Sequence, residues 1–72
     1  MTFAEAAAYR MPFGKFLGQR LEDAARDDRS LLYLDWMVGQ GWVPDRTREA
    51  LAAYLSEPAV ATRVARLFNA GR

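Results

Sequence analysis

The sequence contains no cysteine and no histidine. It therefore cannot form a disulfide, and it lacks the two side chains that most often hold zinc. Small domains commonly need such cross-links, because a chain of about 60 residues buries only roughly 60% of the surface that its unfolded form exposes. We expect residues 1–72 to form a single domain that is stabilised by its apolar core, alone or with a partner, and that carries no metal and no other cofactor.

The sequence also lacks a long apolar run. No stretch approaches the roughly 20 residues that a helix needs to cross a bilayer. The first ten residues, MTFAEAAAYR, hold an acid where a signal peptide has a basic region followed by an apolar one. We therefore predict a cytoplasmic protein without a membrane partner. Hydrophobic residues make up 51% of the chain and aromatic residues 12%, which is typical of a folded globular domain.

The sequence has almost no excess of positive over negative charge, since ten lysines and arginines face nine acids and the net charge is +1. Many nucleic-acid-binding domains are far more basic. The charges are nevertheless separated along the chain: residues 6–21 hold three cations and no acid, residues 22–35 hold five acids and two arginines, and residues 46–72 hold five arginines and two acids. Two interpretations stay open. The blocks arise by chance in a short chain and fold against one another, or a basic block forms a functional face.

Two helices are predicted in the first half of the chain. A T-x-x-E pattern begins at Thr2 and precedes an alanine-rich run, which indicates a capping box and a short first helix. Pro12 disfavours helical geometry in the residue before it, so this helix should end by Met11. Asp28 and Ser30 can cap the stretch LLYLDWMVGQ, which is apolar on almost every side. We expect this stretch to form the central helix, with Trp36 in the core.

Two more helices are predicted in the second half. The third should run from about Asp45 to Tyr54 or Leu55. Pro58 suits the first turn of a fourth helix, which should end at Gly71. The inner stripe of the third helix is expected to hold Thr47, Ala50, Leu51, Tyr54 and Leu55.

The segment RMPFGKFLGQRL, from Arg10 to Leu21, has a different character. The stretches on either side of GKFLG are too short for helices, and Gly14 and Gly18 can adopt the positive φ angles that let a chain reverse. We predict a hairpin or hairpin-like loop over Gly14–Gly18. The fold class that follows is α+β, a small β-hairpin packed on three to four short helices.

The Gly14-Lys15 pair does not indicate a nucleotide-binding loop. A Walker-type loop needs another glycine five residues before the first, and a serine or threonine after the lysine to hold magnesium. Tyr9 and Phe16 occupy those two positions. We expect no small-molecule substrate at this turn.

The acids between Glu22 and Asp28 suggest two chemical roles, a magnesium site or a catalytic carboxylate pair. Helix capping and solvation account for them more simply. No base accompanies Ser30 or Ser56, and histidine and cysteine are absent, so no catalytic constellation is visible. We predict that the protein is not an enzyme.

Two segments of the sequence are similar to a known family of small domains. The segments MPFGKFLGQRLED and YLDWMVGQGWVPDRTREAL resemble a small bacterial and phage domain family with the approximate consensus M-P-F-G-K-Y-K-G, L-x-D or L-E-E, Y-L-x-W-L and an R-x-A-L helix. It includes proteins described as quorum-sensing-regulated virulence factors, and it is similar to the C-terminal domain of exodeoxyribonuclease X-like proteins. The match covers about Arg10–Leu55. Because family members stand alone or are attached to nucleases and helicases, the resemblance implies a non-catalytic accessory domain that contacts nucleic acid or an enzyme acting on it.

The first functional hypothesis is a nucleic-acid-associated module. Cations on an exposed turn can neutralise backbone phosphates without any sequence preference. An aromatic ring at the tip could stack on an unpaired base, although packing onto the central helix is an equally open alternative for that ring. The last helix would assist if it folds onto the same side. The candidate nucleic-acid-binding residues are Arg10, Lys15, Phe16, Arg20, Arg63 and Arg66.

The second hypothesis is a protein-binding adaptor or a phage-type inhibitor that acts on a protein partner. The acidic block from Glu22 to Asp35 could then mimic a nucleic-acid surface or meet a basic partner. Trp42 follows two glycines and precedes Pro44, so its ring should be partly exposed in a joint between helices. Such a ring is a candidate anchor for a partner.

Overall fold

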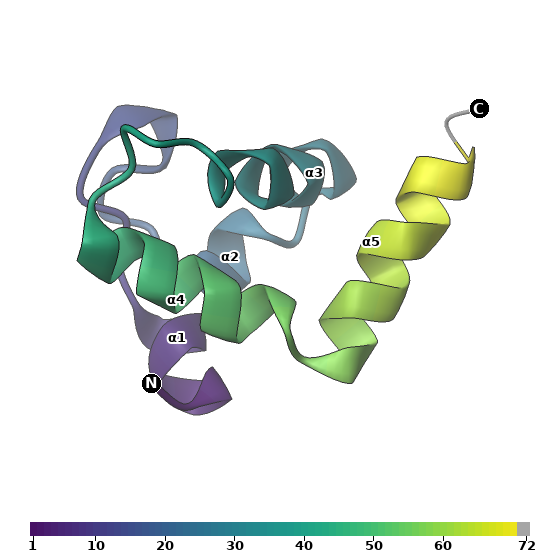
Figure 1. The fold of residues 1–72 in the computed structure, drawn as a ribbon, viewed down its shortest axis with the longest axis horizontal. Coiled ribbons are helices and arrows are strands. Elements are labelled where there is room, and N and C mark those ends of the chain that lie inside the picture. Colours follow the sequence, from purple (N-terminus) through teal and green to yellow (C-terminus); the bar gives the residue numbers. More distant parts are fainter. Residues whose placement is uncertain (71–72) are drawn as a thin grey trace.

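The computed structural model describes residues 1–70, which form a helical domain. Its elements are α1 (Phe3–Ala8), a 3₁₀ turn (Gly14–Phe16), α2 (Leu21–Ala24), α3 (Asp28–Met37), α4 (Asp45–Leu55) and α5 (Pro58–Ala70). α1 packs against α4 and α2, whereas α3 packs against α4 and α5 (Figure 1). The long axis of the molecule runs from the loop that contains the 3₁₀ turn to α5 (Figure 1). None of the helices among residues 1–70 combines the length and the apolar character needed to cross a membrane. The predicted end of the last helix, Gly71, lies outside the described residues.

The predicted α+β fold is wrong, because residues 1–70 contain no strand and no sheet. The loop between α1 and α2 is closed by a single antiparallel bridge between Arg10 and Arg20. Strand pairing does not continue outward from this bridge, because α1 ends at Ala8 and α2 begins at Leu21. It does not continue inward, because the 3₁₀ turn occupies the tip of the loop. The positive φ angles expected for the reversal are present, 72° at Gly14 and 81° at Gly18. The chain therefore reverses as expected but within a loop, not a β-hairpin.

The helix starts agree closely with the sequence. In the capping box of α1, the Thr2 amide donates to Glu5 Oε1 at 2.9 Å and the Glu5 amide donates to Thr2 Oγ1 at 3.1 Å. α3 is capped by Asp27, whose Oδ2 accepts from the Ser30 amide at 3.0 Å. One element was not expected: the one-turn helix α2 forms within the acidic stretch.

The core lies between α3, α4 and the loop. Its largest fully buried side chains come from these three parts and from the first residue of α2: Met11, Leu21, Leu31, Leu34, Thr47 and Leu51. Thr47 is the polar member, and its hydroxyl is satisfied by a 2.8 Å hydrogen bond with the Tyr9 hydroxyl. The predicted inner stripe of α4 is confirmed, because its members are buried except for the partly buried Leu55.

The placement of Trp36 in the core is wrong, since this residue is 51% exposed. Leu31, Leu34 and Met37 supply the buried face of α3. Two residues advance an α-helix by about 200°, so Trp36 points away from Leu34. The stretch looked apolar on every side, but only one side of it faces the core.

Candidate functional site

Arg10 and Arg20 lie side by side on the loop between α1 and α2. Their bridge is flanked by hydrogen bonds from the Met11 amide to the Gln19 carbonyl and from the Leu21 amide to the Tyr9 carbonyl, both 2.9 Å. This pattern makes Arg10 and Arg20 a non-hydrogen-bonded pair, whose Cβ atoms are typically about 5 Å apart on one face. The backbone thus holds two exposed arginines together.

The two arginines differ in what they contact. The Arg10 Nη1 atom donates to the Gly18 carbonyl at 2.7 Å, which fixes its guanidinium over the loop. Arg20 makes no hydrogen bond or ion pair through its side chain with residues 1–70. The pair therefore offers one cation oriented by the loop and one cation without a partner among residues 1–70, both of the kind that can neutralise phosphates.

Lys15 lies at the tip of the same loop and leans toward α3. Its Nζ atom is 5.1 Å from the ring centroid of Phe16 and 5.2 Å from that of Tyr33. Both distances are within the roughly 6 Å over which a cation is attracted to an aromatic face. No acid among residues 1–70 pairs with Lys15. This cation is therefore positioned by aromatic rings and keeps its charge uncompensated.

Phe16 does not provide the exposed stacking surface considered for it. The residue is only 6% exposed, because the 3₁₀ turn directs its ring toward α3, where it lies 6.0 Å from the ring of Tyr33. The alternative of packing onto the central helix is the one that the structure shows. A ring so deeply buried cannot present a face to a base.

Tyr33 is the exposed ring beside Lys15, Trp36 is stacked on Tyr33, and neither residue was among the sequence candidates. Their centroids are 5.5 Å apart and their planes differ by 29°, so the rings stack. They are 38% and 51% exposed. The spacing could have identified them: Arg29, Tyr33 and Trp36 share the side of α3 opposite its buried leucines. We call Lys15, Arg29, Tyr33 and Trp36 the α3 aromatic surface.

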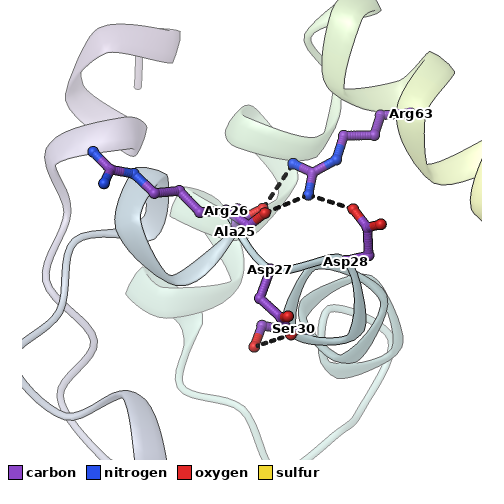
Figure 2. Close-up of polar contacts among 6 residues, drawn as sticks. All are labelled: Ala25, Arg26, Asp27, Asp28, Ser30 and Arg63. Atoms are coloured by element: carbon purple, nitrogen blue, oxygen red, sulfur yellow. Dashed lines mark hydrogen bonds and ion pairs between the residues drawn. The ribbon is translucent and has the colours of Figure 1, made fainter.

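Arg63 is used inside the molecule (Figure 2). Its Nη1 donates to the Ala25 carbonyl at 2.7 Å, and its Nη2 donates to the Arg26 carbonyl and to Asp28 Oδ1, both at 2.8 Å. The two carbonyls follow the last turn of α2, where backbone acceptors lack intrahelical partners. Arg63 therefore joins α5 to the junction between α2 and α3, and its donors are not free for phosphates.

Arg66 is exposed on α5 and makes no ion pair with residues 1–70. α5 lies at the opposite end of the long axis from the loop (Figure 1). Arg63 and Arg66 were expected to assist nucleic-acid binding only if the last helix folded onto the same side as the loop, and it does not. The structure brings Arg10 and Arg20 together and places Lys15 in their loop, but it brings neither Arg63 nor Arg66 to them.

Trp42 lies in the joint between α3 and α4 and is 55% exposed, as expected. Its ring meets the edge of Phe13 at a centroid distance of 5.6 Å. The joint is fixed by Arg48, whose Nη2 donates to the carbonyls of Gln40 and Val43 at 2.8 and 3.0 Å. Arg48 does not belong to the predicted inner stripe of α4, yet it is half-buried because of these hydrogen bonds. A partner-binding role for Trp42 stays a prediction.

Among residues 1–70, two titrating groups have a shifted pKa, and both lie away from the loop tip. Hydrogen bonds from the Thr2 backbone and side chain lower the pKa of Glu5. Burial raises the pKa of Tyr54, whose ring stacks on Phe3 at 5.2 Å. Residues 1–70 hold no group of three or more acidic, histidine or cysteine side chains that could bind a metal ion, and they form no pocket.

No protein-family model matches this chain, and no curated protein or solved structure matches it. The resemblance to the family with the M-P-F-G-K-Y-K-G motif therefore stays a hypothesis that rests on the motif residues. What the chain binds has to be argued from its own surface.

Proposed function

We propose that this protein is a non-catalytic accessory module of the cytoplasm that binds the backbone of nucleic acid through its loop between α1 and α2. The observation that carries the proposal is the bridge that holds Arg10 beside Arg20, with Lys15 at the tip of the same loop. Three cations are thus displayed on 11 consecutive residues, 10 to 20, that contain no acid. A nucleic-acid enzyme acting on the same strand is the partner that such a module would serve.

The physical basis is release of counterions. Each phosphate that a lysine or arginine neutralises frees condensed cations, and binding then weakens with salt by a slope of about −0.9 per contact on duplex DNA and −0.7 on a single strand. Three contacts therefore predict an affinity loss of roughly 20- to 40-fold between about 50 and 200 mM salt. The contact needs no pocket, and residues 1–70 form none.

A salt titration of a fluorescently labelled oligonucleotide tests the proposal. We expect Lys15→Ala and Arg20→Ala each to reduce the slope of log affinity against log salt by about 0.7 to 0.9. Arg66→Ala is the matched control, because Arg66 is an exposed arginine far from the loop, and its slope should equal that of the unaltered protein. Absence of binding at micromolar protein and low salt would refute the proposal, as would equal effects of Lys15→Ala and Arg66→Ala.

The exposed ring of Trp42 supports a second candidate, a protein-binding adaptor or inhibitor. Tryptophan is a frequent interface anchor, and the edge contact with Phe13 together with the Arg48 hydrogen bonds limits the motion of this joint. The adaptor predicts a stoichiometric protein complex that Trp42→Ala abolishes and Lys15→Ala leaves intact. The nucleic-acid proposal predicts the reverse pattern for oligonucleotide binding.

A further inference from the structure

The outer side of α3 carries two large aromatic rings that the core does not use. Leu31 and Leu34 are fully buried on the inner side of this helix, whereas Tyr33 and Trp36 are exposed on the outer side. An exposed tyrosine or tryptophan alone is ordinary, but these two rings stack on each other. The surface is therefore a continuous aromatic area and not two isolated side chains.

This aromatic area is held in place from below. The ring of Tyr33 lies 6.0 Å from that of the buried Phe16 and 5.5 Å from that of Trp36, so three rings follow one another from the core to the surface. These ring contacts restrict the rotamers of Tyr33 and Trp36 before any partner binds. A partner that stacks on Trp36 then loses less conformational entropy than it would on a free side chain.

The surroundings of the rings are cationic. Lys15 Nζ lies 5.2 Å from the Tyr33 centroid, and Arg29 is exposed one helical turn before Tyr33. Of the two acids within α3, Asp28 is paired with Arg63, and Asp35 is set about 100° around the helix from Trp36. Aromatic rings flanked by uncompensated cations match a ligand that has flat apolar rings and negative charge.

From these observations we propose that the α3 aromatic surface selects single-stranded nucleic acid, with an unpaired base stacked on the ring of Trp36, which itself rests on Tyr33, and the adjacent phosphate held by Lys15. In a duplex the bases stack on their own neighbours, whereas an unpaired base has a free face. Base stacking on aromatic side chains tolerates any sequence, which agrees with contacts that carry no base-specific hydrogen bonds. This inference rests on the proposed function and adds the strandedness of the ligand.

The test compares three labelled ligands of about 12 nucleotides: oligothymidine, a duplex, and an abasic strand with the same number of phosphates. We expect the unaltered protein to bind oligothymidine roughly 5- to 150-fold more tightly than the abasic strand. Trp36→Ala should remove that difference, and Trp36→Phe should keep most of it. Trp42→Ala is the matched control, because Trp42 is equally exposed, and it should change oligothymidine affinity less than about twofold.

The outcomes separate this inference from the proposed function. If the abasic strand binds as tightly as oligothymidine and its affinity still falls with salt and with Lys15→Ala, the backbone proposal stands and the stacking inference is overturned. Preference for the duplex would also overturn it. If none of the three ligands binds, both the stacking inference and the backbone proposal are overturned. The comparison of ligands on the unaltered protein decides the question even if Trp36→Ala does not fold.

Discussion

The two ends of this molecule use their arginines in opposite ways. At the α5 end, Arg63 donates to two backbone carbonyls and to Asp28, so its guanidinium holds α5 to the junction between α2 and α3. At the loop end, Arg20 and Lys15 face solvent without an acid partner among residues 1–70. In the sequence, both ends are blocks in which cations outnumber acids. What a cation faces, and not its presence in a basic block, decides whether it stabilises the fold or is available to a ligand.

The two ends also differ in how they are ordered. Arg63 connects segments that are 38 residues apart, from Ala25 to α5, and its hydrogen bonds are long-range. The backbone of the loop is closed by local contacts, namely one bridge, the Arg10 hydrogen bond to Gly18 and two glycines with positive φ. Its Met11 and Phe16 side chains are buried in the core. Changes at Arg63 should therefore affect the whole fold, whereas changes at the exposed cations of the loop should act locally.

The largest effect is expected for Arg63→Ala. Two carbonyls and Asp28 lose their donor, and hydrogen bonds to charged groups contribute about 1.5 to 3 kcal/mol each, reduced here by partial exposure. We expect the free energy of unfolding to fall by about 2 kcal/mol, which lowers Tm by roughly 8 to 16 °C for a domain of this size. Thermal unfolding followed by circular dichroism measures this. Arg66→Ala should stay within about 0.5 kcal/mol, and equal losses in both variants would remove the distinction between the two arginines.

A smaller effect is expected for Gly18→Ala in the loop. The φ angle of 81° disfavours any L side chain by about 1 to 2 kcal/mol, although nothing lies within 4 Å of the added Cβ. Gly41→Ala is the control, because the space around its Cβ is also empty and its φ is not in the left-handed region. Urea unfolding should show a loss for Gly18→Ala and no loss for Gly41→Ala. A neutral Gly18→Ala would mean that the loop does not need this turn.

The sequence predicted the local features of the fold well and the long-range ones poorly. The Thr2 capping box and the two glycine turns depend on neighbouring residues, so a pattern identifies them. The exposure of Trp36 depends on which side of α3 meets α4 and α5. The hydrogen bonds of Arg63 depend on the position of the carbonyls that follow α2, up to 38 residues away in the sequence. Neither can be read from spacing alone.

The candidate site was predicted in the same partial way. The cations of the loop follow from a stretch without acids, and their pairing follows from the reversal at Gly14 and Gly18. The contribution of α3 was missed because an apolar stretch suggested burial on every side. The helical spacing of Tyr33 and Trp36 opposite Leu31 and Leu34 was the signal that could have revealed it.

The smallest effect is expected at α1, which belongs to neither end. Hydrogen bonds from Thr2 lower the pKa of Glu5 in the folded state. A carboxyl group whose pKa is lowered in the folded state stabilises the fold at pH values above its unfolded pKa of about 4.3. This stabilisation is lost as the pH falls through the folded-state pKa. Glu5→Gln keeps an acceptor oxygen for the Thr2 amide and should flatten this acid-side decline in Tm. An unchanged pH dependence in Glu5→Gln would contradict the role of the capping box.

The most direct test of the central claim, that the loop and α3 bind a ligand while α5 serves the fold, is an NMR titration of the ¹⁵N-labelled protein with oligothymidine at low salt. We predict that the amides of Gly14–Gly18 and the indole N–H of Trp36 shift, while the amides of α5 and the indole of Trp42 do not. Shifts centred on α5 or on Trp42, with the loop unchanged, would contradict this account.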